Sequence, residues 1–133
     1  RSKLMNRRSM DYSFSKSYIL CKQIEINELF SKGKRVRNQA FTILYQKVPR
    51  NGSPFQVLIS VPKRKIKKAV DRNYIKRCVR EVVRKNKELL VFEENEDEKS
   101  VHFAIIYSVD SKLDYSNIER HLLDLFNKIP NKK

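Results

Sequence analysis

The segment from residue 72 to residue 84 combines an apolar stripe with a dense set of positive charges, and it constrains the fold more than any other part of the sequence. At about 100° per residue in a helix, its apolar residues share one face: Ile75, Cys78, Val79 and Val82. The roughly opposite arc carries basic and amide residues: Arg72, Asn73, Lys76, Arg77, Arg80, Arg84 and Lys87. The pattern predicts a long helix over about residues 69–90 that docks on a core through one face and meets a polyanion through the other.

The charge around this helix is almost entirely positive. Between residues 63 and 87 the chain has twelve Lys and Arg residues against two acidic ones. A solvated surface helix usually mixes signs, because opposite charges at i,i+4 support it. Like charges on one helix repel each other and destabilise the folded state, unless a partner neutralises them. The net charge of +15 fits a nucleic acid, whereas a membrane-surface helix would carry Trp, Phe or Leu opposite its cations.

Length and composition narrow the class further. A chain of 133 residues fits one domain, which we place at residues 14–130 as an RNA-binding domain, behind a flexible basic tail at residues 1–13. The sequence has no apolar run long enough to span a bilayer and no apolar signal segment, so we expect a cytoplasmic protein without a membrane partner. Cys21 and Cys78 are isolated thiols that predict neither a disulfide framework nor a metal site, and Cys78 is interpreted as a small core residue.

The remaining periodicities predict an α-β-β-α-β-α order. A first helix over about residues 22–32 ends at Gly33. Two strands follow, residues 41–46 and 55–61, which a turn containing Asn51-Gly52 would join as a hairpin.

The second half of the chain continues this order. After the long helix, the acidic run at residues 93–98 is interpreted as a solvated loop, and residues 101–108 are apolar enough for a central strand. Ser116 and Glu119 form a capping box for the last helix. The apolar residues of that helix predict a buried stripe: Ile118, Leu122, Leu125, Phe126 and Ile129.

Each predicted strand has a bulky face and a smaller, mixed one. The bulky faces hold Phe41, Ile43, Tyr45, Val57, Ile59, Val61, Phe103, Ile105 and Tyr107. The mixed faces hold Thr42, Leu44, Gln46, Gln56, Leu58, Ser60, His102, Ala104 and Ile106. If helices cover the bulky face, the mixed face can form a shallow groove suited to a single-stranded nucleic acid. An ordinary solvated sheet face explains the alternation equally well.

Catalytic constellations do not stand out in the sequence. His102 and His121 are isolated, the two glycines form no phosphate-binding loop, and the acidic residues concentrate at residues 93–98. We therefore expect no catalytic residue, metal site or cofactor on the protein itself.

Several of these segments together resemble the protein subunit of bacterial ribonuclease P. The resemblance runs in order through short motifs: residues 14–16, Leu20, residues 26–33, Phe41, residues 59–64 and residues 69–77. The most specific signal is Arg72-Asn73 followed by Ile75-Lys76-Arg77, after the basic loop at residues 63–68. The family's helix usually begins Arg-Asn-Arg, and this chain has Tyr74 at the third position. Tyr74 cannot make the ionic phosphate contact of that Arg, and stacking on an RNA base is a replacement role for it.

The resemblance implies a fold and a mechanism. The fold is an α/β (α+β) sandwich of the ribosomal-protein-S5-domain-2-like class, with a mostly antiparallel central sheet, helices packed on it and a left-handed βαβ crossover. The protein would act within an endoribonuclease that removes the 5′ leader of precursor tRNA. Cleavage would belong to the RNA subunit and its magnesium ions, with one protein monomer per RNA subunit.

The resemblance also assigns residues to the two RNA partners. Those for the catalytic RNA are Lys63, Arg64, Lys67, Lys68, Arg72, Asn73, Lys76, Arg77 and Arg80. Those for the leader groove are Ile26, Phe30, Thr42, Leu44 and Ser60. Two other functions are kept as alternatives: a general structured-RNA-binding protein of ribosomal type, and a protein-only nuclease, which the missing carboxylate cluster disfavours.

Overall fold

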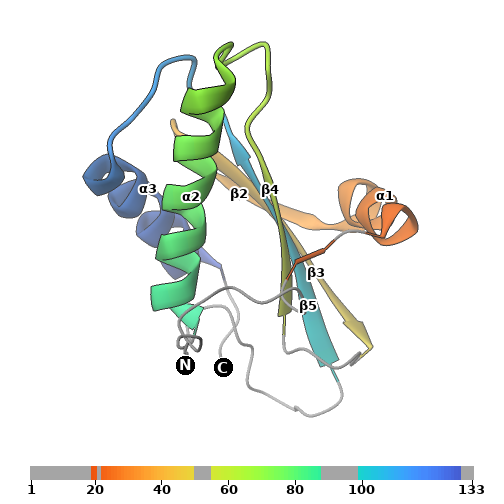
Figure 1. Cartoon of the computed structure of the whole chain (residues 1–133). Helices are drawn as coiled ribbons and strands as arrows, with labels where there is room; N and C mark the ends of the chain where they lie inside the picture. Colours follow the sequence, from red (N-terminus) through yellow and green to blue (C-terminus); the bar gives the residue numbers. More distant parts are fainter. Residues whose placement is uncertain (1–18, 21, 50–54, 88–98, 130–133) are drawn as a thin grey trace, which may run out of the picture.

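The computed structural model describes residues 19–20, 22–49, 55–87 and 99–129 (Figure 1). These residues form helices and the strands of one sheet. In chain order the elements are α1 (Gln23–Lys32), β2 (Lys34–Arg37), β3 (Phe41–Pro49), β4 (Phe55–Ser60), α2 (Ala69–Lys85), β5 (Lys99–Tyr107) and α3 (Tyr115–Lys128). The predicted helices and strands are all present, and β2 is an additional strand.

The strands form one sheet in the order β2-β3-β5-β4. β3 is antiparallel to β2 and β5, and β4 is parallel to β5. The predicted hairpin of β3 and β4 is therefore wrong, because β5 lies between them. β5 is buried on both faces from Val101 to Ile105, which fits a central strand that pairs on both edges. The predicted α+β class and mostly antiparallel sheet are confirmed; the hand of the β4-α2-β5 crossover stays a prediction.

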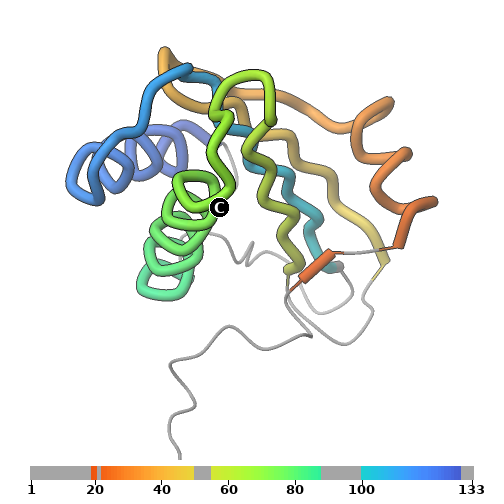
Figure 2. The backbone as a smooth tube through the Cα atoms, turned by 45° about the horizontal axis from the view of Figure 1, so that its top comes forward, coloured from red at the N-terminus to blue at the C-terminus, as the bar shows by residue number. Residues whose placement is uncertain are grey.

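Two helices cover one face of the sheet, and one described helix covers the other (Figures 1 and 2). Figures 1 and 2 show α2 and α3 on one side and α1 on the other. The main core lies under α2 and α3 and contains the bulky residues of the strands, including Phe41, Phe103 and Ile105, all fully buried. The apolar stripe of α2 is buried in the same core, with Cys78 7% exposed, as predicted.

β2 was not predicted, because three of its four residues are basic and give no apolar alternation. Gly33 ends α1 and lets the chain turn closely into β2. A Cβ at this position would lie 2.6 Å from the Leu29 carbonyl oxygen and 2.8 Å from Leu29 Cδ1. The predicted helix stop at Gly33 is confirmed, and the pairing of β2 with β3 supplies the backbone hydrogen bonds that make these polar residues a strand.

The cap of α3 differs from the prediction. The helix begins at Tyr115, and the carboxylate of Asp114 accepts a hydrogen bond of 3.1 Å from the Asn117 backbone N–H. Asp114 rather than Ser116 is thus the N-cap. Its negative charge also interacts favourably with the helix dipole. The predicted buried stripe from Ile118 to Ile129 is confirmed.

Some predictions lie outside the described residues: the tail at residues 1–13, the turn at 50–54, the acidic loop at 93–98, Cys21 and the last turn of the predicted long helix at 88–90. Among the helices that the structure does describe, none is long and apolar enough to cross a membrane.

Candidate nucleic-acid interface

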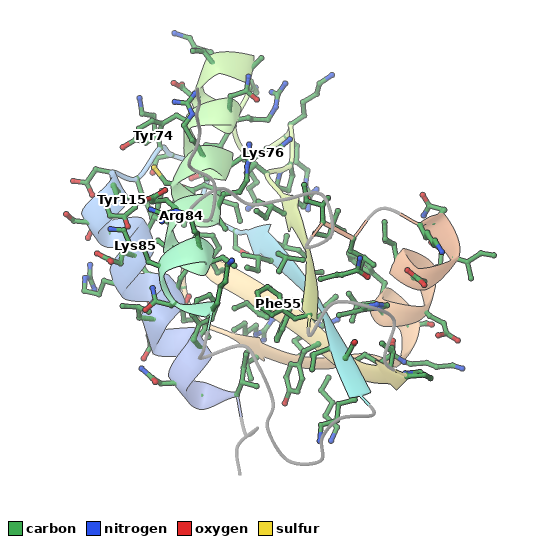
Figure 3. All side chains as sticks on the ribbon, turned by 60° about the horizontal axis from the view of Figure 1, so that its bottom comes forward. Phe55, Tyr74, Lys76, Arg84, Lys85 and Tyr115 are labelled. Atoms are coloured by element: carbon green, nitrogen blue, oxygen red, sulfur yellow. The ribbon has the colours of Figure 1, made fainter. Side chains whose placement is uncertain are left out.

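The exposed flank of α2 carries cations that have no partner within the described chain. Lys76 and Arg80 are half-buried, Arg77 is exposed, and no ion pair joins any of them to a described carboxylate. Figure 3 shows Lys76 on the side of α2 turned toward the β4–α2 connection, and Tyr74 on the side turned toward α3. The apolar underside of α2 is fixed in the main core, so these cations are held outward as a preformed row.

Arg84, which sequence periodicity placed on the same arc, is engaged differently. Its guanidinium forms an ion pair with Glu81 one turn earlier on α2. The hydrogen bond from Arg84 lowers the pKa of the Glu81 carboxyl. Arg84 is therefore less available to an external phosphate than Lys76 or Arg80.

Arg72 ties the basic loop, residues 63–68, to the start of α2. Its Nη1 donates hydrogen bonds of 2.9 Å to the carbonyl oxygens of Ile66 and Lys67. Four predicted RNA-binding residues of this segment are exposed: Lys63, Arg64, Lys67 and Lys68. Arg72 thus orients its neighbours, a role that helical periodicity could not reveal, and Asn73 beside it is exposed.

A hollow of about 450 Å³ lies between the basic loop and the segment before α3. Arg64, Lys67 and Lys68 line it, together with Lys112 from the far wall. Asp71 is also in the lining, and its carboxylate lies 3.6 Å from Lys112 Nζ. Cations from two separate segments therefore converge at the N-terminal end of α2.

Tyr74 stands where the resemblance leads us to expect Arg, and it lies on the α3 side of α2, lining a hollow with Arg77, whereas Lys76 lies on the other side of the helix (Figure 3). Its ring packs against the main core, and Lys112 Nζ lies 4.7 Å from the ring centroid. Lys112 joins Tyr74 and Asp71 into one contact that holds the segment before α3 against α2. The structure gives Tyr74 this anchoring role, and its stacking on an RNA base stays a prediction.

The opposite face of the sheet, on which α1 lies, carries the predicted mixed residues in register. We call it the α1-side face. Strand pairing aligns Thr42 with Ile106 and Ser60, Leu44 with Ala104 and Leu58, and Gln46 with His102 and Gln56. The alternation read from the sequence therefore gave the correct nine residues of one face.

α1 covers the middle of this face. Leu29 packs with Leu44 and Ala104 in a second buried cluster, and Leu44 is only 2% exposed. The prediction that Leu44 lines an accessible groove is therefore wrong, because the side chain of Leu29 lies over it. Leu44 supports α1 from below.

The row at one side of α1 stays accessible. Thr42, Ile106 and Ser60 are half-buried, and we call them the open row. Ile26 of α1 and Ile106 both pack against the second buried cluster, and Phe30, one turn further along α1 than Ile26, is 45% exposed. Four of the five predicted groove residues thus border accessible surface. Ile106 joins them; sequence alternation had placed it on this face without assigning it to the site.

His102 lies in the row at the other side of α1 and is 2% exposed. Its Nε2 and the paired Gln46 Oε1 are buried without hydrogen-bond partners among the described residues. Burial lowers the pKa of His102, and the carboxylates of Glu25 and Glu28 on α1 oppose this shift. His102 is thus a buried histidine of the α1-side face.

We expect the stability of the protein to depend on this histidine below neutral pH. Because the pKa of His102 is lower in the folded chain than its ordinary value of 6.5, the unfolded chain binds the proton first. The free energy of unfolding therefore falls as the pH drops below about 6.5. Urea unfolding of the wild type and His102→Gln, at about pH 7.5 and about pH 5.5, should show a smaller loss on acidification for the variant. Equal losses would assign the pH dependence to other groups.

Comparison with known proteins gives one consistent result. A family model described as Ribonuclease P matches residues 14–130. A protein of Porphyromonas gingivalis named ribonuclease P protein component is 32% identical over 112 residues, covering 82% of this chain and 80% of that protein. Its counterpart in Thermotoga maritima is 44% identical over 59 residues, covering 44% of this chain and 48% of the other.

Two solved structures are similar in fold. The RNase P protein of Staphylococcus aureus superposes with a TM-score of 0.70 at 23% identity, covering 87% of this chain and 98% of that chain. The RNase P protein of Thermotoga maritima gives a TM-score of 0.66 at 26% identity, covering 85% of this chain and 98% of that chain.

Proposed function

The chain belongs to the ribonuclease P protein family, and we propose that it binds the RNA subunit of that enzyme through α2 and the basic loop while its α1-side face holds the 5′ leader of precursor tRNA. As a ribonuclease P protein component it is part of a tRNA-processing endoribonuclease with an RNA partner. Beyond this family role, we propose precursor tRNA as the substrate and assign the two RNA-binding surfaces.

The observation that carries the RNA-binding part is a set of cations on one flank of α2 and in the loop before it, which form no ion pair with any residue that the structure describes. Lys76 and Arg80 project from a helix whose other face is fixed in the core. Its backbone therefore loses little conformational entropy when these side chains bind phosphates. Phosphate contacts of this kind supply most of the affinity of nucleic-acid complexes and fix their register.

The leader part is supported by the open row and by Phe30. Single-stranded RNA is held by aromatic and apolar side chains that stack on bases, next to cations that follow the backbone. Phe30 offers an exposed ring on α1, and Thr42 and Ser60 of the open row are half-buried on the face that α1 covers. A leader bound here adds contacts that mature tRNA lacks, so the enzyme can hold its substrate and release its product.

In this proposal the cleavage step and its magnesium ions belong to the RNA subunit. Within the residues that the structure describes, no group of three or more His, Cys, Asp or Glu side chains is placed to hold a metal ion. The protein acts by neutralising phosphates of the folded RNA, which lowers the magnesium concentration that the RNA needs. One protein monomer per RNA subunit is sufficient for these roles.

Reconstitution tests the proposal directly. The protein is added to a bacterial ribonuclease P RNA at a magnesium concentration too low for the RNA alone, with precursor tRNA as substrate. We expect stimulation of cleavage at the mature 5′ end, and no cleavage by the protein without the RNA. If the protein fails to stimulate, the assignment is wrong.

A general structured-RNA-binding function is the second candidate, because the cations of α2 could meet the phosphates of many RNAs. The two functions differ in the α1-side face. A general binder gives the reconstituted particle equal affinity for precursor and mature tRNA, whereas the proposed function requires tighter binding of the precursor.

A further inference from the structure

The edge strand β2 carries two arginines on the α1-side face. Strand pairing places Arg37 beside Thr42 and Arg35 beside Leu44, and paired residues of neighbouring strands point to the same face. Lys34 and Val36 point the other way, and Val36 accordingly packs against the main core. Arg35 and Arg37, which we call the β2 arginines, therefore belong to the face that carries the open row.

The β2 arginines are exposed and available. Neither forms an ion pair or a side-chain hydrogen bond with any residue in the described ranges. The carboxylates of Glu25 and Glu28 on α1 interact electrostatically with His102 and oppose the lowering of its pKa. His102 and Arg37 belong to rows on opposite sides of Leu44. The positive charge on β2 is thus left for an external anion.

Arg37 stands at one end of the open row, and the basic loop stands at the other. The paired positions run from Arg37 through Thr42 and Ile106 to Ser60. Directly after Ser60 the chain passes Val61 and Pro62 and enters the loop that carries Lys63 and Arg64. With neighbouring strands about 4.8 Å apart, the row crosses roughly 14 Å of sheet. A polar and apolar floor with cations at both ends suits an extended strand with stacked bases and a charged backbone.

We propose that Arg35 and Arg37 bind phosphates of the single-stranded leader where it crosses the α1-side face, which extends the leader site to the β2 edge of the sheet. This inference rests on the proposed function, since it takes the leader as the strand that occupies the open row. Charges on edge strands also prevent sheets from pairing edge to edge. That simpler role would be served by Lys34 as well as by the arginines.

Lys34 provides the matched control, because it is exposed on the same strand and points to the opposite face. Arg35→Gln, Arg37→Gln and Lys34→Gln each remove one charge from β2. The assembled particle is titrated with precursor and mature tRNA over a series of salt concentrations, and melting curves accompany each variant.

We expect each arginine variant to lower the salt slope of precursor binding by about 0.7, and the double variant by about 1.4, as for phosphate contacts to single strands. Lys34→Gln should leave precursor binding unchanged, and all variants should bind mature tRNA as the wild type does. If Lys34→Gln weakens precursor binding as much as either arginine variant, or if the arginine variants weaken mature tRNA equally, the inference is overturned. A wild-type particle that does not prefer precursor tRNA refutes the proposed function instead.

Discussion

Replacing Lys76 and Arg80 together with alanine is expected to weaken binding of the ribonuclease P RNA about 100-fold. Hydrogen bonds to charged groups contribute roughly 1.5 kcal/mol or more each, and about 1.4 kcal/mol corresponds to a factor of ten. The slope of log K against log salt should fall by about 1.8, or 0.9 for each lost phosphate contact on a duplex. Filter binding or fluorescence titration of the RNA at several salt concentrations measures both quantities.

A control variant removes two charges elsewhere. Lys85 lies on the α3 side of α2, with its Nζ 5.3 Å from the centroid of the Tyr115 ring, and Lys128 on α3 pairs with Asp124. Lys85→Ala with Lys128→Ala should change RNA affinity far less than the Lys76 and Arg80 pair. Equal losses for the two pairs would mean that only net charge matters. Arg72 is left unchanged in this comparison, because its bonds to the basic loop would mix folding with binding.

The second large effect concerns two neighbouring residues of α1. Leu29 is fully buried in the second cluster, and Leu29→Ala is expected to lower the free energy of unfolding by about 2–5 kcal/mol. Phe30 is 45% exposed, so Phe30→Ala should destabilise the fold by only about 1 kcal/mol. The same change should weaken binding of precursor tRNA roughly tenfold, since stacking of one base on an aromatic ring contributes about 1–3 kcal/mol.

Urea unfolding and affinity measurements on the assembled particle separate these two roles. Phe30→Leu, which keeps apolar bulk but removes the ring, serves as the control for packing and should share the binding defect of Phe30→Ala. A Phe30→Ala particle that keeps the wild-type preference for precursor over mature tRNA would remove Phe30 from the leader site.

Local periodicity was sufficient to predict the helices and the two faces of the sheet. The apolar spacing of α2 and the alternation of β3, β4 and β5 each show which face of the element is buried. Such patterns can be recognised from neighbouring residues in the sequence. The observed burial of Ile75 and Val79, and the register of Thr42 with Ile106, follow from them.

Strand order and accessibility could not be predicted in this way, because they depend on contacts between distant segments. Nothing in the sequence of residues 50–54 shows that β5 will lie between β3 and β4. The burial of Leu44 requires the position of Leu29, and the loop-holding role of Arg72 requires the path of residues 66–67. The β2 arginines were missed because a basic strand has no apolar alternation; their spacing of two residues after Gly33 was the available signal.

The most direct test of the two-surface account is to map where the leader touches the protein. A precursor tRNA with a photoreactive nucleotide in its leader is bound to the assembled particle, crosslinked, and the modified peptides are identified by mass spectrometry. The account predicts crosslinks on the α1-side face, at Phe30, at Thr42 or Ser60 of the open row, and at the β2 arginines. Crosslinks confined to α3, or spread over the surface without preference, would contradict it.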